Sequence, residues 1–540
     1  MIENQGFKQL LQTMDPRAPI PSRNYLRNET LVSYYHEVKG TVREIMEGAS
    51  RHAITTDLWT SSGNEDYLTI TAHMISNDFN MHAFVLQTRN MSERHTAENL
   101  QIEFEKAKIE WKLVDPFSVT DNAKNITNTF EKFLKWDHLG CMAHTINLSV
   151  SKCFKVTQVA RLLGKCRRVV SHFRRSPLQN KYLHEKQTLL SLPTHSLIID
   201  VETRWNSTHD MVERLLQQEP AICAVLLNSE KRDDRQLTFS DDEVKNMRSL
   251  VNILKPLKSA TVLVGAEKSP TSSRMYPVLL KLKKHLAPVD QDNNFCKEMK
   301  QVMLNDLESR HKSDSDQRFM KLACLVDPRC KDLGFLSSED VEFTKDLLKT
   351  ECTILENKSN EPNRDIMIKV EPEVPDQQTN HDQFADAANA NPPLPNLPSL
   401  PSASADPTVK SEPKDVGPSC SPPASKKSKP SPEPDFLSDI IITRVQAPQP
   451  FHEKIEIELK AYLNEPSIEL NMCPLAWWKA KGHLYPNIAT VARRTLCVPA
   501  TSVPSERIFS AAGFCSDKRR SNLAPENLDM LIFLNKNLKV

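Results

Sequence analysis

Three short runs of β-forming residues share one stretch, residues 52–88: HAITTDLWTSSGNEDYLTITAHMISNDFNMHAFVLQT. The runs cover residues 52–59, 67–75 and 81–88. The turn-forming sequences GNED and NDFN separate them. In the middle run Thr69, Thr71 and His73 alternate with apolar residues, which is the period of a strand with two unlike faces. The stretch therefore predicts a three-stranded antiparallel meander with one face in water.

The pattern after the meander continues as helix, strand and helix. We expect a helix at about 96–111, a strand that ends near Thr120, and a second helix at about 122–135. Three strands followed by helix, strand and helix is the order of a ribonuclease-H-like domain. The sequence thus predicts an α/β fold for residues 51–150.

Two carboxylates fall at the ends of predicted strands. Asp57 lies in ITTDLWTS and Asp121 in FSVTDNAKN. Carboxylates at the strand ends of an α/β sheet can converge on one crevice. There they can hold two divalent cations such as Mg²⁺ for in-line phosphoryl displacement. The alternative is that each aspartate caps the helix or turn that follows it.

From about residue 155 the apolar period becomes helical. Seven apolar residues recur at helical spacing: Val159, Leu162, Leu163, Cys166, Val169, Val170 and Phe173. The opposite face carries four basic residues: Arg161, Lys165, Arg168 and Arg175. This face could grip DNA phosphates, or it could be a solvated helix face. Ser240 and Glu243 form a capping-box pattern at the start of a later helix, so residues 151–355 are expected to be a helical domain.

A change in composition marks the main boundary. Residues 361–435 hold 16 of the 36 prolines and no tryptophan or tyrosine. Such a segment buries too little apolar surface to offset the conformational entropy of the chain. We expect a disordered linker at 356–446, an N-terminal helical segment at 1–50 and a C-terminal region at 447–540.

The overall composition excludes several classes of protein. Lys+Arg is 70 and Asp+Glu is 69, so a basic surface for nucleic acid must be local. The longest apolar run, Ala221 to Leu227, is far shorter than the roughly 18 residues that a membrane span needs, and we expect no membrane partner. The 12 cysteines contain no Cys-x2-Cys pair, so the thiols are expected to be reduced and zinc is not predicted.

Several motifs identify a family. They are TTDLWTS, VTDNAKN, GCMAHTINL, TRWNST, PLAWWK, YPNIATVARRTLCVPATSVPSERIFSAAG and NLAPENLDMLIFL. Together they resemble the hAT transposase superfamily, and above all the vertebrate BED-type zinc-finger proteins domesticated from such elements. The resemblance covers roughly 5–350 and 450–540. It implies a ribonuclease-H-like domain interrupted by a large helical insertion, with a C-terminal hAT dimerisation region that completes the domain.

The resemblance implies an acidic triad. Asp57, Asp121 and, in PSERIFS, Glu506 match the acids that bind metal and cleave DNA in the family. If the chain is an enzyme, it is a DDE-type transposase that uses Mg²⁺ for strand cleavage and transfer. Without the family, Glu506 is a first-turn acid favoured by the helix dipole.

Two further motifs match family elements. Arg204 and Trp205 match a pair in which the tryptophan stacks on an extruded base; the alternative is a tryptophan that anchors the core of the helical domain. Cys141 and His144 match a Cys-x2-His element. Two ligands make an incomplete zinc site, so His144 is expected to orient a carboxylate or backbone group near the acids.

The C-terminal region carries large apolar side chains that the family uses for dimerisation as well as for core packing. The candidates are Trp477, Trp478, Leu528, Leu531 and Ile532. Aromatic anchors are typical of such interfaces. Burial within one chain is the alternative.

The linker carries signals of its own. Lys369 and Lys410 each lie in a hydrophobic-Lys-x-Glu pattern followed by proline, and are SUMO acceptor candidates. A lysine-rich run at 426–429 is a nuclear-localisation candidate. The BED finger that the family places upstream of the region matching 5–50 has no counterpart here, which adds to the expectation of no finger-bound zinc.

Three hypotheses follow. The first is a domesticated hAT protein in the nucleus, a dimer bound to DNA or chromatin, in transcription regulation with a SUMO linkage; one relative is regarded as a SUMO ligase. The second is an active transposase. The third is a homodimer or heterodimer partner of finger-bearing relatives. The intact triad favours the second hypothesis, and the proline-rich insert and absent finger favour the first, in which the chain is not an enzyme.

Overall fold

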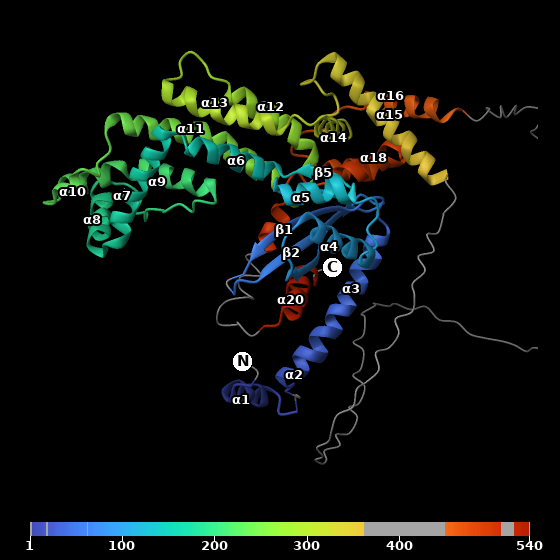
Figure 1. Ribbon diagram of the computed structural model, residues 1–540, viewed down its shortest axis with the longest axis horizontal. Helices are drawn as coiled ribbons and strands as arrows, with labels where there is room; N and C mark the ends of the chain where they lie inside the picture. The colour runs from blue at the N-terminus through green and yellow to red at the C-terminus, as the bar shows by residue number, and fades with distance from the viewer. Residues whose placement is uncertain (1–2, 18–19, 62, 361–448, 509–522, 539–540) are drawn as a thin grey trace, which may run out of the picture. The chain divides into compact units, whose positions relative to one another are not determined.

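Five strands form one mixed sheet in the computed structural model (Figure 1). The strands are β1 (Ala53–Thr60), β2 (Asp66–Ile75), β3 (Met81–Asn90), β4 (Phe117–Thr120) and β5 (Asp137–Gly140). Their order is β3-β2-β1-β4-β5, in which β1, β2 and β3 pair antiparallel while β1–β4 and β4–β5 pair parallel. The predicted meander and the strand ending near Thr120 are therefore confirmed.

The structure describes residues 3–17, 20–61, 63–360, 449–508 and 523–538. The expected linker falls outside them from residue 361 to its end at 446. Before that point α15 (Ser338–Asn360) continues as a helix past residue 356, the expected start of the linker.

One face of the sheet is covered by helices close to it in the sequence. The helices are α3 (Leu31–Glu47) and α4 (Ala97–Glu110). Leu68, Ile70 and Ala72 of β2 are fully buried there, against Phe104 of α4 and Val42 of α3. After β4 the chain forms α5 (Lys124–Asn128), which continues as a π-helical turn (Thr129–Leu134), in agreement with the helix expected at 122–135.

The other face of the sheet was expected to be wet, and that expectation is wrong. Thr69, Thr71 and His73 are all at most 3% exposed. The C-terminal part of the chain covers this face: Ser505 Oγ hydrogen-bonds to Thr55 Oγ1, which hydrogen-bonds to Thr71 Oγ1. The helix α20 (Pro525–Asn537) lies along the edge strand β3, where Asp529 Oδ1 accepts a hydrogen bond of 2.5 Å from the backbone N–H of Thr88. β2 has the alternating pattern of a half-exposed strand, but its polar side chains hydrogen-bond to partners inside the protein instead of to water.

Between β5 and the C-terminal region, residues 142–360 form a series of helices (Figure 1). The helices before α15 are α6 (Met142–Phe154), α7 (Thr157–Arg175), α8 (Pro177–Leu189), α9 (Trp205–Leu227), α10 (Arg232–Arg235), α11 (Asp241–Val264), α12 (Met275–Leu286), α13 (Asn294–Arg310) and α14 (Asp314–Leu325). All seven apolar positions expected to face the core of α7 are at most 5% exposed. The capping box of Ser240 and Glu243 opens α11 as predicted.

The remaining helices lie at the two ends of the chain. They are α1 (Gln5–Met14), α2 (Arg23–Tyr25), α16 (Phe451–Asn464), α17 (Pro474–Lys481) and α18 (Pro486–Leu496). Among the described helices, none has the length and apolar character needed to cross a bilayer.

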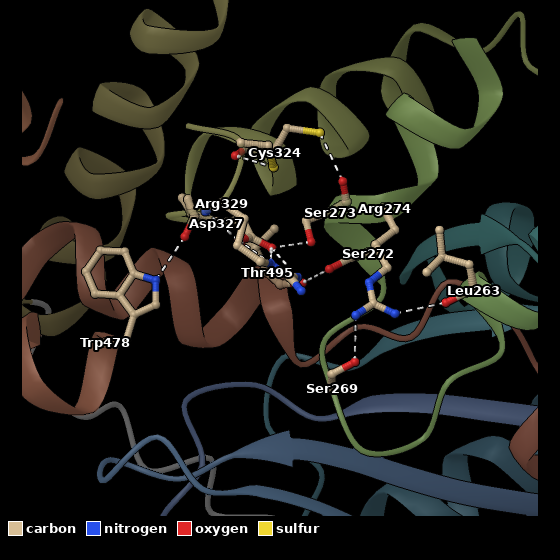
Figure 2. Close-up of polar contacts among 12 residues, drawn as sticks. Leu263, Ser269, Ser272, Ser273, Arg274, Cys324, Asp327, Arg329, Trp478 and Thr495 are labelled. Atoms are coloured by element: carbon tan, nitrogen blue, oxygen red, sulfur yellow. Dashed lines mark hydrogen bonds and ion pairs between the residues drawn. The ribbon is translucent and has the colours of Figure 1, made fainter. Parts of the chain in front are cut away.

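A buried ion pair lies where the helical domain meets the C-terminal region (Figure 2). The Asp327 carboxylate, fully buried, accepts hydrogen bonds from the Arg329 guanidinium at 2.6 Å and from the Ser273 hydroxyl at 2.5 Å. Cys324 Sγ approaches the carbonyl oxygen of Ser273 at 3.2 Å. The carboxylate thus joins the turn after α14 to the turn before α12.

The same turn before α12 holds the segment that follows α18. Ser272 Oγ donates to the carbonyl oxygen of Thr495 at 3.1 Å, and Thr271 Oγ1 accepts from the N–H of Ala500 at 2.9 Å. Trp478 Nε1 donates to the Val326 carbonyl oxygen at 2.9 Å (Figure 2). These contacts fix residues 495–500 relative to the helical domain, close to the acids described next.

Candidate functional site

Asp57 and Asp121 come from neighbouring parallel strands in the same register. Thr55 of β1 pairs with Val119 of β4, and each aspartate follows its paired residue by two positions. Because side chains two apart share a face and adjacent strands lie about 4.8 Å apart, the two carboxyl groups project from one edge of the sheet. Both side chains are partly buried.

Each aspartate also makes a local hydrogen bond. Asp57 Oδ1 accepts from the N–H of Leu58 at 2.9 Å, and Asp121 Oδ1 accepts from the N–H of Ala123 at 3.2 Å. Asp121 therefore caps the turn that follows it, as the alternative expected, in addition to lying beside Asp57. A single backbone donor leaves further acceptor positions on each carboxylate for another ligand.

Glu506 is brought to the same edge by the segment after α18. The Ser505 hydroxyl hydrogen-bonds to that of Thr55, 450 residues away in the sequence, with the two oxygens 2.6 Å apart. The Met142 N–H donates to the Ala500 carbonyl oxygen at 3.0 Å. Residues 500–505 are thus held against β1 and the end of β5.

The electrostatics place the three acids in one neighbourhood. Burial and, after it, the negative charges of Glu506 and Asp121 raise the pKa of Asp57 to about 7. Burial also raises the pKa of Glu506, an effect that the nearby Arg204 guanidinium opposes and the Asp121 charge reinforces. The structure therefore brings together all three acids that the sequence predicted, with Arg204 beside them.

The donor set fits a hard divalent cation. The charge of Asp121 raises the pKa of both Asp57 and Glu506, so the three acids concentrate negative charge at this edge, and carboxylate oxygens are the ligands that Mg²⁺ prefers. Their oxygens do not all approach within 4.8 Å of one another, since the described residues contain a single three-ligand group that tight: His209, Asp210 and Glu213 on α9. An open set of acids suits Mg²⁺, which keeps water or phosphate oxygens in its shell.

Cys141 and His144 have different roles beside the acids. Cys141 is fully buried, and its Sγ accepts hydrogen bonds from the N–H groups of His144 at 3.4 Å and Ser502 at 3.3 Å. Burial raises the pKa of its thiol, so it stays protonated and fastens the 500–505 segment to α6. Burial lowers the pKa of His144, and the Asp121 charge partly restores it, which agrees with the expected place of His144 near a carboxylate.

Arg204 and Trp205 differ in their exposure to solvent. Arg204 is exposed at the start of α9. Trp205 is 3% exposed and belongs to the main hydrophobic core, so its ring would have to leave the core to stack on a base. The structure supports the core-anchor alternative for Trp205.

The four basic residues expected on α7 also have different surroundings. Lys165 is bound by Glu243 at 2.6 Å and by the Thr238 carbonyl oxygen at 2.8 Å. Arg161 is exposed. Arg168 and Arg175 line an open groove of about 650 Å³. Lys231, which sequence reasoning missed because it lies in a different segment, lines the same groove.

Family models match three regions of the chain. The ZBED1 RNase-like domain covers residues 55–140, the ZBED1 RNase-like helical domain covers 139–253, and the hAT family C-terminal dimerisation region covers 458–538. Zinc finger BED domain-containing protein 4 of Homo sapiens is 25% identical over 99% of the chain. The chain is a relative of the hAT transposases and of the BED-type proteins.

Two plant proteins extend the comparison. The "Putative AC transposase" of Zea mays is 21% identical, and RICESLEEPER 2 of Oryza sativa, a zinc finger BED domain-containing protein, is 20% identical, each over 98% of the chain. This hAT relative spans 42% of the length of the human protein, 62% of the maize protein and 71% of the rice protein.

Within the dimerisation region of this hAT relative, the side chains expected at the interface mostly face inward. Trp478 is fully buried and stacks on Tyr462 with ring centroids 5.2 Å apart. Leu528 and Ile532 are at most 2% exposed. Two of the five expected residues are partly exposed: Trp477 and Leu531. Core packing within one chain is therefore the role that the structure gives to the buried three.

Two expected modification sites lie outside the described residues. Lys369 and Lys410 both fall in residues 361–448. Their role as SUMO acceptors remains a prediction from the sequence.

Proposed function

We propose that this hAT relative is a domesticated nuclear protein that associates with DNA or chromatin as a dimer and takes part in transcriptional regulation. The observation that carries the DNA association is the groove between α7, α8 and α10. Arg168, Arg175 and Lys231 line it, and among the described residues none of their charged groups has an ion-pair partner.

The groove is suited to a phosphate backbone. Asp234, an acid in the lining of the groove, accepts a hydrogen bond from Ser229 Oγ at 2.6 Å and lies 3.6 Å from His172 Nδ1. Its carboxylate therefore already has contacts within the protein. Ser171 and Gln179 add neutral hydrogen-bond donors to the lining. Cations with nearby hydroxyl and amide donors are the groups that contact DNA phosphates without reading sequence.

The SUMO linkage belongs to the same proposal. Lys369 and Lys410 each stand in an attachment pattern within a proline-rich segment. Support for this part comes from the sequence alone.

A second candidate is metal-dependent DNA strand cleavage, favoured by the acidic cluster. Asp57, Asp121 and Glu506 would hold Mg²⁺, which when bound neutralises charge that develops on a phosphoryl group. The pKa of about 7 for Asp57 means that a cation would compete with a proton at this carboxyl. Arg204 would contribute a positive charge at the edge of the same site.

One experiment separates the two candidates. The full chain is mixed with a labelled duplex of about 20 base pairs that ends in a hairpin, with Mg²⁺ or Mn²⁺, over a series of salt concentrations. We expect salt-sensitive binding without nicking. The plot of log K against log salt should become less steep by about two in Arg168→Ala/Arg175→Ala, because each lost phosphate contact removes roughly 0.9 from the magnitude of the negative slope.

The control is Arg94→Ala/Arg248→Ala, which removes two exposed arginines that do not line the groove and should keep the wild-type slope. Nicking of the duplex by the wild-type chain that disappears in Asp121→Asn would contradict the regulator proposal and support metal-dependent DNA cleavage instead. Failure of the wild-type chain to bind the duplex at any salt concentration would overturn the DNA association.

A further inference from the structure

The dimerisation region exposes apolar side chains beyond the five that were expected at the interface. Leu470 is 80% exposed, Met472 56% and Leu484 55%. Leu470 and Met472 lie in the turn between α16 and α17, and Leu484 lies just after α17. With the partly exposed Trp477, we call these residues the 470–484 patch.

The turn that carries Leu470 and Met472 is anchored to the helical domain at its N-terminal end and closed by a hydrogen bond of its own backbone. The Ile468 N–H donates to the Pro328 carbonyl oxygen at 3.1 Å, and Ser467 Oγ donates to Asp332 Oδ2 at 2.5 Å. The Met472 N–H donates to the Glu469 carbonyl oxygen at 3.0 Å. A turn held by its own backbone and by the helical domain loses little further conformational freedom when a partner covers it.

Glu465 joins this turn to the part of the patch around α17. Its carboxylate accepts a hydrogen bond from the Tyr485 hydroxyl at 3.1 Å and is ion-paired with Lys481. Tyr485 lies parallel to the Trp477 ring at 6.1 Å between centroids, and Lys481 lies over that ring at 5.7 Å. Glu465, at the start of the turn, is therefore held against Lys481 and Tyr485, which flank Leu484.

The composition of the patch fits a protein partner better than bulk water. Tryptophan and methionine are enriched at the centres of interfaces, and a polar rim surrounds such centres. The rim here has both signs of charge: Glu469 and Lys479 are exposed beside the apolar residues. A surface with both signs can be complementary to itself across a twofold axis, where each copy offers the same patch.

We propose that the 470–484 patch is the contact through which a second copy of this chain binds. The whole patch lies inside residues 458–538, the range matched by the hAT C-terminal dimerisation region, and this match points to a second copy as the occupant. The proposal rests on the dimeric state within the proposed function and adds the residues that make the contact. It replaces the buried Trp478, Leu528 and Ile532 as the candidates.

The test is the oligomeric state of the full chain by light scattering after size-exclusion chromatography and by sedimentation equilibrium. We expect a wild-type dimer, and a dissociation constant at least 100-fold higher in Leu470→Asp/Met472→Asp, because two charges would be buried without partners. Both residues are exposed in the single chain, so the thermal unfolding midpoint of the monomer should not fall.

The matched control is Ile109→Asp/Val262→Asp. These side chains are 73% and 69% exposed and lie outside residues 458–538, so this variant should stay dimeric. A Leu470→Asp/Met472→Asp variant that dimerises like wild type would overturn the patch and leave the dimer intact. A wild-type chain that is monomeric at about 100 µM, a concentration that exceeds a micromolar dissociation constant, would overturn the dimer itself.

Discussion

Asp57→Asn is expected to make the metal-free protein more stable at pH 8, by about 1–3 kcal/mol. The pKa of Asp57 is raised from 3.8 to about 7, first by burial and then by Glu506 and Asp121. A shift of roughly three units corresponds to about 4 kcal/mol, and partial solvent exposure reduces it. Asparagine keeps an oxygen for the Leu58 N–H and removes the charge.

The pH dependence gives the sign of this effect. Since the folded-state pKa lies above the unfolded value, the folded wild-type chain binds more protons between pH 4 and 7, and its stability falls as pH rises through 7. The gain from Asp57→Asn should therefore be small at pH 4 and largest at pH 8. Urea unfolding in EDTA at both values measures it.

The control for this prediction is Asp78→Asn, which changes an exposed aspartate in the turn between β2 and β3 and should alter stability by less than about 0.5 kcal/mol. A loss of stability in Asp57→Asn at pH 8 would mean that burial and the neighbouring carboxylates do not disfavour the charged form of Asp57 as inferred.

Asp327→Ala should cost about 3–5 kcal/mol of unfolding free energy. The substitution would leave the Arg329 guanidinium buried without its counter-charge and Ser273 without its acceptor (Figure 2). Removing one partner of a buried pair is far more costly than the pair's net contribution. Denaturant unfolding, followed by circular dichroism, measures the loss.

Two comparisons identify the cause of that loss. Asp327→Leu/Arg329→Met removes both charges and should cost much less than the single change. Glu342→Ala breaks an exposed i,i+3 pair with Lys345 and should cost less than about 1 kcal/mol. If Asp327→Ala unfolds within 1 kcal/mol of wild type, the buried ion pair does not hold the turn after α14 to the turn before α12.

Local pattern was enough for much of the fold. The period of two in β2 and the helical period of α7 depend on neighbours in the sequence, and both elements formed where expected. β5 was not expected, because its four residues, DHLG, are too few and too polar to show a period. The buried state of Thr71 and His73 could not be foreseen, because the segment that covers them lies more than 400 residues later.

The candidate site divides in the same way. Asp57 lies in one strand that the residues alone predict and Asp121 directly follows another, so their convergence could be inferred from the parallel pairing of β1 and β4. Glu506 came only from the family resemblance, because the contact between Ser505 and Thr55 spans 450 residues. An apolar pattern also does not tell a core from an interface, which is why Trp478 was expected at a dimer contact and lies inside the chain.

Binding of Mn²⁺ by the full chain tests most directly whether the three acids act as one centre. Isothermal titration at pH 7.5 should detect binding in the wild-type chain and in Glu213→Gln, which alters the three-ligand group on α9. Asp57→Asn, Asp121→Asn and Glu506→Gln should each weaken that binding at least 10-fold. Wild-type affinity in Glu506→Gln, with loss in the two aspartate variants, would contradict the account, since the C-terminal segment would then contribute nothing to the site.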